Sequence, residues 1–182
     1  MAIKSTVFKA ELQITDMDRN YYQSHLLTIA RHPSESDARM MVRLLAFALH
    51  ASPSLQFTKG ISADDEPDLW QKNLSDEIEL WIDLGQPDDK RIRKACGRAR
   101  QVIIYNYQQR SGAAWWQQHA NKLARFSNLS IVSLDDETVA GFCGMAQRTM
   151  QLSYTIQDGQ IWLSDGEHTV EIAVESWKNI RT

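Results

Sequence analysis

One stretch of the chain combines an apolar strand pattern, a carboxylate and a dense run of positive charge. Residues 77–100 read EIELWIDLGQPDDKRIRKACGRAR, with Asp83 inside the apolar part. Ten acidic residues lie between Asp64 and Asp89, and six basic residues follow by Arg100. Carboxylates bind hard divalent cations, and basic side chains hold phosphate. This juxtaposition is typical of magnesium-assisted phosphodiester hydrolysis, in which the metal activates a water and neutralises charge on phosphorus.

The same charges also have an ordinary structural interpretation. Alternation along the strand puts Glu79, Trp81 and Asp83 on one face, which predicts a half-exposed strand face. Lys94 lies nearly opposite the apolar stripe of the following helix and should be solvated, whereas Arg91 flanks that stripe. The stripe consists of Ile92, Ala95, Cys96 and Ala99. From the charges alone, a solvated helix face is favoured over a phosphate site.

The elements that must position these residues follow from hydrophobic periodicity. Residues 6–15 alternate and predict a strand whose core face carries Phe8, Ala10, Leu12 and Ile14. A helix is expected to follow, capped by Asp16 or Asp18 and carrying Tyr22, His25, Leu26 and Ile29. Ser34 is expected to cap a second helix that ends before Pro53, with Glu35 in its first turn.

The remaining elements alternate between strands and helices. Residues 55–62 predict a short strand, and residues 63–73 a turn or a single helical turn. Asp88 is expected to cap a helix that ends near Arg100. Asp158-Gly159 predicts the turn of a C-terminal hairpin. Further strands are expected at 77–85, 102–107, 129–134 and 168–174, and a further helix at 111–126. The order predicts an α+β fold in a single domain over residues 1–182.

The composition and net charge of the chain limit the classes of function that it can have. The chain has 182 residues and a net charge of -3, so no global basic field indicates nucleic-acid binding. Two cysteines without close spacing favour neither a disulfide framework nor a zinc site, which suits a reducing cytoplasm. We expect neither a signal peptide nor a membrane span, hence a cytoplasmic protein without membrane association. The common hydrolase and nucleotide-binding motifs are missing from the sequence.

Several longer strings resemble one bacterial family, the YaeQ family. They are RHPSESDARMMVRLLAFAL, LQFTKGISADDEPDLW, LWIDLGQPDDKRIRKAC, WWQQ and TIQDGQIWLSD, and the resemblance spans essentially the whole chain. It implies a variant of the restriction-endonuclease-like, or PD-(D/E)xK, nuclease fold, with a mixed sheet flanked by helices. Its core is a helix, three strands, a helix and a further strand, which is compatible with the elements expected over residues 33–134.

The resemblance also implies site residues. In such nucleases a glutamate on the first core helix, an aspartate near the second strand and an acid on the third strand bind magnesium or manganese. These positions correspond to Glu35, Asp65 and Asp83, with Asp64 and Asp68 as alternatives for the middle acid.

The lysine that activates water in such nucleases stands two residues after the third-strand acid. Gly85 occupies that position here, so Arg91 or Lys94 of the neighbouring helix would have to serve. Arg91 is better directed, whereas lysine is the better chemical match because arginine stays protonated.

Two functions are therefore open. The first is a magnesium-dependent phosphodiesterase that acts on nucleic acid through Asp83, Asp65 and Glu35, with Arg91 or Lys94 on the scissile phosphate. The second is a binding or regulatory protein that retains the nuclease fold without catalysis, which the missing lysine and the mild negative charge favour. The choice between DNA and RNA as substrate, and the oligomeric state, stay open.

Overall fold

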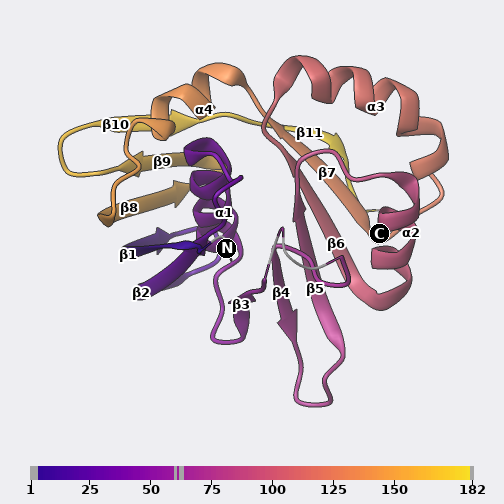
Figure 1. Ribbon diagram of the computed structural model, residues 1–182, viewed down its shortest axis with the longest axis horizontal. Helices are drawn as coiled ribbons and strands as arrows, with labels where there is room; N and C mark the ends of the chain where they lie inside the picture. Colours follow the sequence, from indigo (N-terminus) through magenta and orange to yellow (C-terminus); the bar gives the residue numbers. More distant parts are fainter. Residues whose placement is uncertain (1–3, 60, 62–63, 181–182) are drawn as a thin grey trace. The chain divides into compact units, whose positions relative to one another are not determined.

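The computed structural model describes residues 4–59, 61 and 64–180, which form two compact units (Figure 1). The first unit contains residues 4–44 and 137–173, and the second contains residues 45–136 and 174–180. Each unit has its own sheet, and both sheets mix parallel and antiparallel pairs. Helix α1 (Asp37–His50) spans the division between the units. The predicted α+β class is thereby confirmed.

The sheet of the first unit has the strand order β10–β9–β8–β1–β2. Strand β1 runs antiparallel to β2 and parallel to β8. The strands are β1 (Thr6–Asp16), β2 (Tyr21–Arg31), β8 (Thr149–Gln157), β9 (Gln160–Ser164) and β10 (Thr169–Ile172), and helix α4 (Asp136–Cys143) lies almost wholly in this unit. The predicted core face of β1 is confirmed, because its alternate residues from Phe8 to Ile14 are all buried.

The prediction of a helix after Asp16 or Asp18 is wrong, because this segment forms strand β2. The apolar spacing fitted a helix, but pairing with β1 over eleven residues decides the structure. Asn20, at a positive φ of 55°, turns the chain back, and Asp16 accepts hydrogen bonds from Arg19 within the turn. Asp18 accepts hydrogen bonds from the backbone N–H groups of the Asp158-Gly159 turn. That turn joins β8 to β9 as predicted.

The sheet of the second unit has the strand order β11–β7–β6–β5–β4–β3. Strands β5, β6 and β7 are parallel and are connected by helices, whereas the outer pairs are antiparallel. The elements are β3 (Leu55–Phe57), β4 (Leu69–Lys72), β5 (Ile78–Leu84), α2 (Asp89–Arg98), β6 (Ala99–Asn106), α3 (Gln109–Leu123), β7 (Leu129–Leu134) and β11 (Val174–Lys178).

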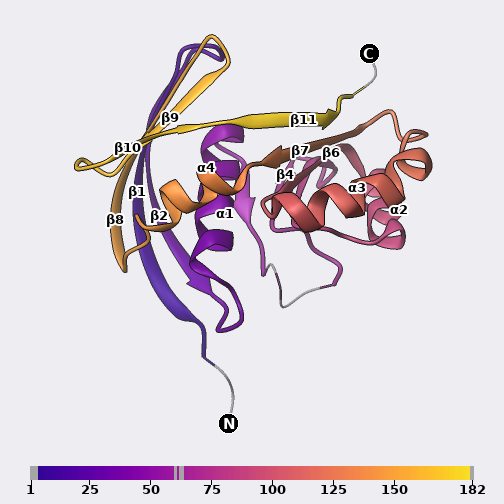
Figure 2. The same cartoon turned by 90° about the horizontal axis from the view of Figure 1, so that it is seen from above.

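Helices α2 and α3 cover one face of this sheet (Figure 2). Ile92 and Ala95 of α2 join Trp115 and Leu123 of α3 in one apolar cluster with strand residues such as Trp81. Burial of this much apolar surface fixes α2 against β5 and β6. The face that carries Asp83 is therefore the covered face, and the expected half-exposed strand face is wrong.

Three boundaries differ from prediction. Helix α1 begins at Asp37 and is capped by Ser36, whose Oγ accepts the N–H of Arg39, so Glu35 precedes the helix. Strand β4 occupies residues expected in a turn, because Leu69 pairs with Ile82 of β5. Strand β3 is shorter than predicted, and residues 60 and 62 lie outside the described part.

The predicted cap of α2 is confirmed, since Asp88 accepts the N–H of Arg91 at 2.8 Å. No helix in the described residues is long and apolar enough to cross a membrane.

Candidate functional site

The centre of the candidate site is a pair between Asp83 of β5 and Arg91 of α2. The guanidinium donates from Nε to Oδ2 and from Nη2 to Oδ1, both at 2.9 Å. The Asp83 side chain is 4% exposed and that of Arg91 is 29% exposed. Two parallel hydrogen bonds of this kind are the strongest neutralisation that one side chain gives a carboxylate. Arg91, which flanks the apolar stripe of α2, thus reaches the site as its position on the helix predicts.

A second buried acid, Asp68, lies beside Asp83. Its carboxylate Oδ2 accepts the N–H of Leu84 at 3.0 Å, and its own N–H donates to the carbonyl of Ile82 at 3.0 Å. Asp68 directly precedes β4, so the two carboxylates lie side by side at the paired ends of β4 and β5. Burial raises the pKa of the Asp83 carboxyl above its usual value, the Arg91 guanidinium opposes this shift, and the negative charge of Asp68 adds to it.

The same pairing acts on Arg91. Burial lowers the pKa of its guanidinium, but the Asp83 carboxylate raises this pKa by more. The pKa of Arg91 therefore lies above the usual value of an arginine. Arg91 therefore stays a permanent cation at this position.

Helix α2 also holds the acidic loop that precedes β4. Arg91 donates to the carbonyls of Asp64 at 3.0 Å and Glu66 at 2.9 Å, and Arg98 donates to the carbonyl of Asp65 at 2.7 Å. Residues seven apart lie on one side of a helix, so both arginines reach the same loop. The basic run thus binds the acidic run of its own chain.

Lys94 contacts the side chain of Asp65, the residue predicted as the middle acid. Their side chains are 48% and 79% exposed. The hydrogen bond from Lys94 holds the pKa of Asp65 below its usual range. Lys94 is solvated as the helical wheel predicted, and Asp65 lies on the surface. Asp68, one of the two alternatives, is the acid that lies next to Asp83.

Glu35 lies in the first unit, before α1, and its carboxylate is bound there. Arg43 donates to its two oxygens at 2.7 and 2.8 Å, and Arg39 donates to Oε1 at 3.4 Å. The side chains of Glu35 and Arg43 are 3% and 5% exposed. All contacts seen for the Glu35 carboxylate are with arginines of its own unit.

These donors do not fit a divalent metal in this arrangement. Both oxygens of Asp83 accept hydrogen bonds from Arg91, so a guanidinium lies where a second cation would have to approach this carboxylate. Across the residues that the structure describes, no three His, Cys, Asp or Glu side chains are grouped so as to hold a metal ion. A magnesium ion needs open carboxylate oxygens, so Arg91 would first have to leave Asp83.

The residues around Asp68 predict a turn, whereas in the structure Asp68 directly precedes β4 and lies next to Asp83. The loop contacts of Arg91 were not predictable, because they join residues 25 and 27 positions apart.

Comparison with known proteins identifies relatives along nearly the whole chain. The family described as YaeQ protein matches residues 1–174. The YaeQ proteins of Salmonella typhi and Escherichia coli strain K12 are 49% and 48% identical, each over 98% of both chains. The crystal structure of YaeQ from Xanthomonas axonopodis pv. citri has a TM-score of 0.92 at 45% identity, covering 96% of this chain and 98% of that one. That of Pseudomonas syringae YaeQ has a TM-score of 0.92 at 32% identity, covering 96% and 97%.

Proposed function

The chain belongs to the YaeQ family, and we propose that it is a non-catalytic binding module built on a nuclease-like core. One observation carries this proposal: the guanidinium of Arg91 occupies both oxygens of Asp83, the acid that a nuclease of this kind would use to hold its metal. An internal cation thus takes the place of an external one. This cation carries one positive charge, against the two of a magnesium ion, and it neutralises Asp83 itself.

The order of elements supports a nuclease-like core. Helix α1 is followed by three strands, β3, β4 and β5, then by helix α2 and strand β6. This is the order that the PD-(D/E)xK resemblance implies. Asp68 then corresponds to the acid at the second strand and Asp83 to the acid on the third strand.

The residues available to act as a general base support a protein without catalytic activity. Arg91 is a permanent cation and cannot accept a proton from water. Lys94 is bound to Asp65 on the surface and has no contact with Asp83 among the described interactions. Gly85 carries no side chain at the motif position. None of these three residues is therefore a good general base for a water held at Asp83.

The charge distribution favours a protein partner over nucleic acid. Of the six basic residues from Lys90 to Arg100, four contact acidic side chains or carbonyls of their own unit: Arg91, Lys94, Arg98 and Arg100. Non-specific nucleic-acid binding depends on cations that replace counterions along the phosphate backbone. Half of this run, Arg91, Lys94 and Arg100, is paired with carboxylates, and with a net charge of -3 this leaves fewer cations for a phosphate backbone.

A second candidate is the magnesium- or manganese-dependent phosphodiesterase. The observation in its favour is the presence of two neighbouring buried carboxylates, Asp83 on β5 and Asp68 directly before β4. A buried acid with a raised pKa and a specific charged partner is a common mark of a functional site. In this candidate function the two acids would hold the metal, which would neutralise charge on phosphorus.

Calorimetric titration with magnesium and manganese separates the two functions. The binding module predicts no saturable heat for the wild type, for Asp83→Asn or for the surface control Asp65→Asn. The phosphodiesterase predicts binding in the wild type and in Asp65→Asn that is lost in Asp83→Asn. That second pattern, together with metal-dependent cleavage of single- or double-stranded nucleic acid, would refute the binding module.

A further inference from the structure

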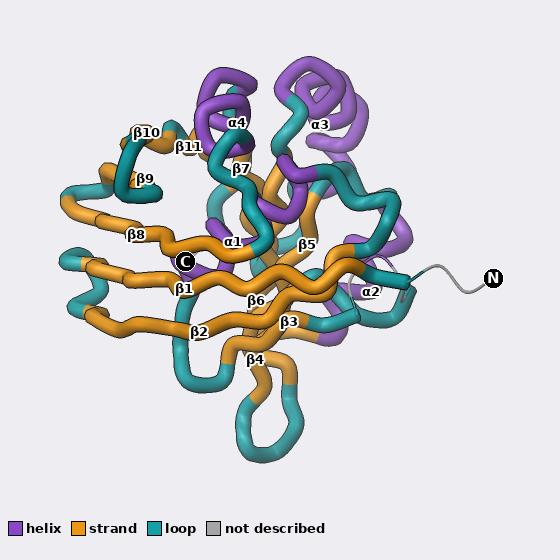
Figure 3. Tube along the Cα trace, turned by 60° about the vertical axis from the view of Figure 1, so that its left-hand side comes forward, coloured by secondary structure: helices purple, strands orange, loops and turns teal. Residues whose placement is uncertain are grey.

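The outer face of the first unit's sheet is exposed. Figure 3 shows β8, β1 and β2 side by side in this sheet. Successive residues of a strand point to opposite faces. Because the even-numbered residues of β1 from Phe8 to Ile14 are buried, its odd-numbered residues lie on the outer face. The pairing registers then identify the residues of the other four strands that share this face.

One row across the outer face carries two aromatic side chains. Its residues, one from each strand in the order from β10 to β2, are Glu171, Trp162, Thr155, Thr15 and Tyr22. Tyr22 is 53% exposed, and Trp162 is half-buried. The two rings are three strand spacings apart, or about 14 Å. An elongated ligand that runs across the strands can therefore contact both rings.

The next row along the strands contains only hydroxyl and amide side chains. Its residues, again from β10 to β2, are Thr169, Ser164, Ser153, Gln13 and Ser24. In the described part of the chain, the exposed side chains of Ser153, Gln13 and Ser24 make no hydrogen bond to another residue. Hydroxyls and amides both donate and accept hydrogen bonds. This row therefore offers open groups of both kinds beside the two rings.

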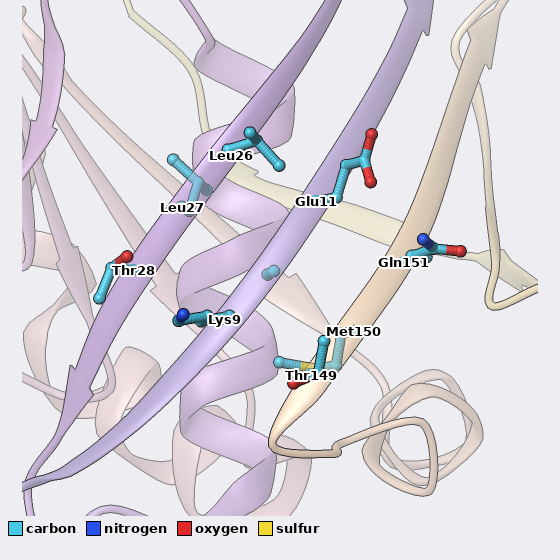
Figure 4. Close-up of a pocket in the computed structure, with 9 residues that line it drawn as sticks. Lys9, Glu11, Leu26, Leu27, Thr28, Thr149, Met150 and Gln151 are labelled. Carbon is cyan, nitrogen blue, oxygen red and sulfur yellow. The ribbon is translucent and has the colours of Figure 1, made fainter.

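The two rows are almost uncharged. Glu171, on the edge strand β10, is the only Asp, Glu, Lys or Arg in either row. Figure 4 shows the two rows beyond them, which carry the charged residues Glu11 and Lys9 of β1 and border a hollow of about 330 Å³. Nucleic acids and anionic lipids are bound through cations. Neither class of partner therefore fits the two rows between Trp162 and Tyr22.

We propose that these two rows bind an uncharged oligosaccharide. A sugar ring has an apolar C–H face that packs on an aromatic ring, and hydroxyl groups that pair with hydroxyl and amide side chains. Both kinds of contact are available here, with rings at Trp162 and Tyr22 and polar groups between and beside them. The core of a protein–protein interface is a contiguous apolar patch, and the polar residues between the two rings interrupt such a patch.

The proposal does not depend on the proposed function of the Asp83–Arg91 pair. The two rows belong to the first unit, and that pair belongs to the second. Metal titration of the Asp83 site and sugar binding by the first unit can therefore fail separately.

Calorimetric titration of the full chain with cellohexaose, maltohexaose and chitohexaose tests the site. At least one of these neutral chains is expected to bind. Tyr22→Ala and Trp162→Ala should each raise its dissociation constant about tenfold, because each removes one stacking ring. Val7→Ala is the matched control, because Val7 is 49% exposed on the same face but lies eight residues, or about 26 Å, from Thr15 along β1. Its dissociation constant should equal that of the wild type.

The fluorescence of Trp162 gives a second measurement. Trp162 is the only tryptophan of the first unit. The bound sugar should change the emission of the wild type but not that of Trp162→Phe. Tyr22→Ala keeps the test independent of folding, because Tyr22 is exposed and its replacement removes no core side chain.

Three results would overturn the proposal. The first is neither heat nor a change in emission with any of the three sugars. The second is binding that Tyr22→Ala and Trp162→Ala leave as tight as in the wild type. The third is a dimer in place of sugar binding, dissociated by either alanine variant in sedimentation velocity, which would assign this face to a second copy of the chain.

Discussion

Replacement of Arg91 by alanine tests whether its guanidinium is the cation that the buried Asp83 carboxylate requires. The change removes both 2.9 Å hydrogen bonds and leaves a carboxylate whose side chain is 4% exposed next to Asp68. Removal of one partner of a buried ion pair typically costs about 3–5 kcal/mol. Because 29% of the Arg91 side chain is exposed, water can enter the space that it leaves. We therefore expect a loss near the lower end, about 3 kcal/mol at neutral pH.

The loss should depend on pH in a defined direction. Burial already raises the pKa of Asp83 above its ordinary value of 3.8, and removal of Arg91 takes away the main influence that lowers it. A carboxyl whose pKa is higher in the folded than in the unfolded state costs stability when it is ionised. That cost is fully present above the folded-state pKa and disappears as the pH falls toward the unfolded value. The difference between Arg91→Ala and the wild type should therefore shrink as the pH is lowered from neutral to about 4.

Urea unfolding followed by tryptophan fluorescence is a suitable assay. Five of the six tryptophans, all except Trp162, lie in the second unit, so the signal reports mainly on the unit that contains the pair. Arg93→Ala is the matched control, because Arg93 is an exposed arginine on the same helix. Asp83→Asn combined with Arg91→Ala should recover most of the lost stability, since the unpaired charge is then gone. The reasoning is refuted if Arg91→Ala is as stable as Arg93→Ala, or if the double variant is no more stable than Arg91→Ala.

Two further predictions concern packing and thiol reactivity. A Cβ on Gly112 would lie 2.2 Å from the buried Asn106 side chain, so Gly112→Ala should lower the free energy of unfolding by about 2 kcal/mol. A Cβ on Gly97 would meet nothing within 4 Å, so Gly97→Ala should stabilise α2 by about 0.5 kcal/mol. Equal urea midpoints for the two variants would contradict this. Burial raises the pKa of Cys96 to about 11, so in a Cys143→Ser background iodoacetamide should modify it about a hundredfold more slowly at about pH 8 than in urea. Equal rates in the two conditions would show an accessible thiolate.

Local signals in the sequence predicted the elements that local interactions decide. The alternation of β1, the cap at Asp88 and the Asp158-Gly159 turn each depend on residues a few positions apart, and each is confirmed. Strand β2 was missed because its apolar spacing suits either a helix or a strand, and only its partner β1 decides between them. Strand β4 was missed for the same reason, since its partner β5 follows across a separate turn.

In the candidate site, too, only features that depend on local spacing were predictable. The direction of Arg91 followed from the helical wheel, because α2 packs its apolar stripe against the sheet as predicted. The burial of Asp83 did not follow, because alternation identifies which residues share a face but not whether a helix covers that face. The position of Asp68 next to Asp83 did not follow either, because it depends on the pairing of β4 with β5.

Gly85 and the arginine at Asp83 belong to one structural feature, the turn between β5 and α2. Gly85 has a φ of 93°, in the left-handed region, and its N–H donates to the carbonyl of Tyr105 at 2.8 Å. A residue with a side chain would be strained in this backbone conformation, which therefore favours glycine. The turn at Gly85 ends β5 and leads within three residues to Asp88, which caps α2 by accepting the N–H of Arg91. The turn that favours glycine two residues after Asp83 thus leads into the helix that delivers a guanidinium to the same carboxylate.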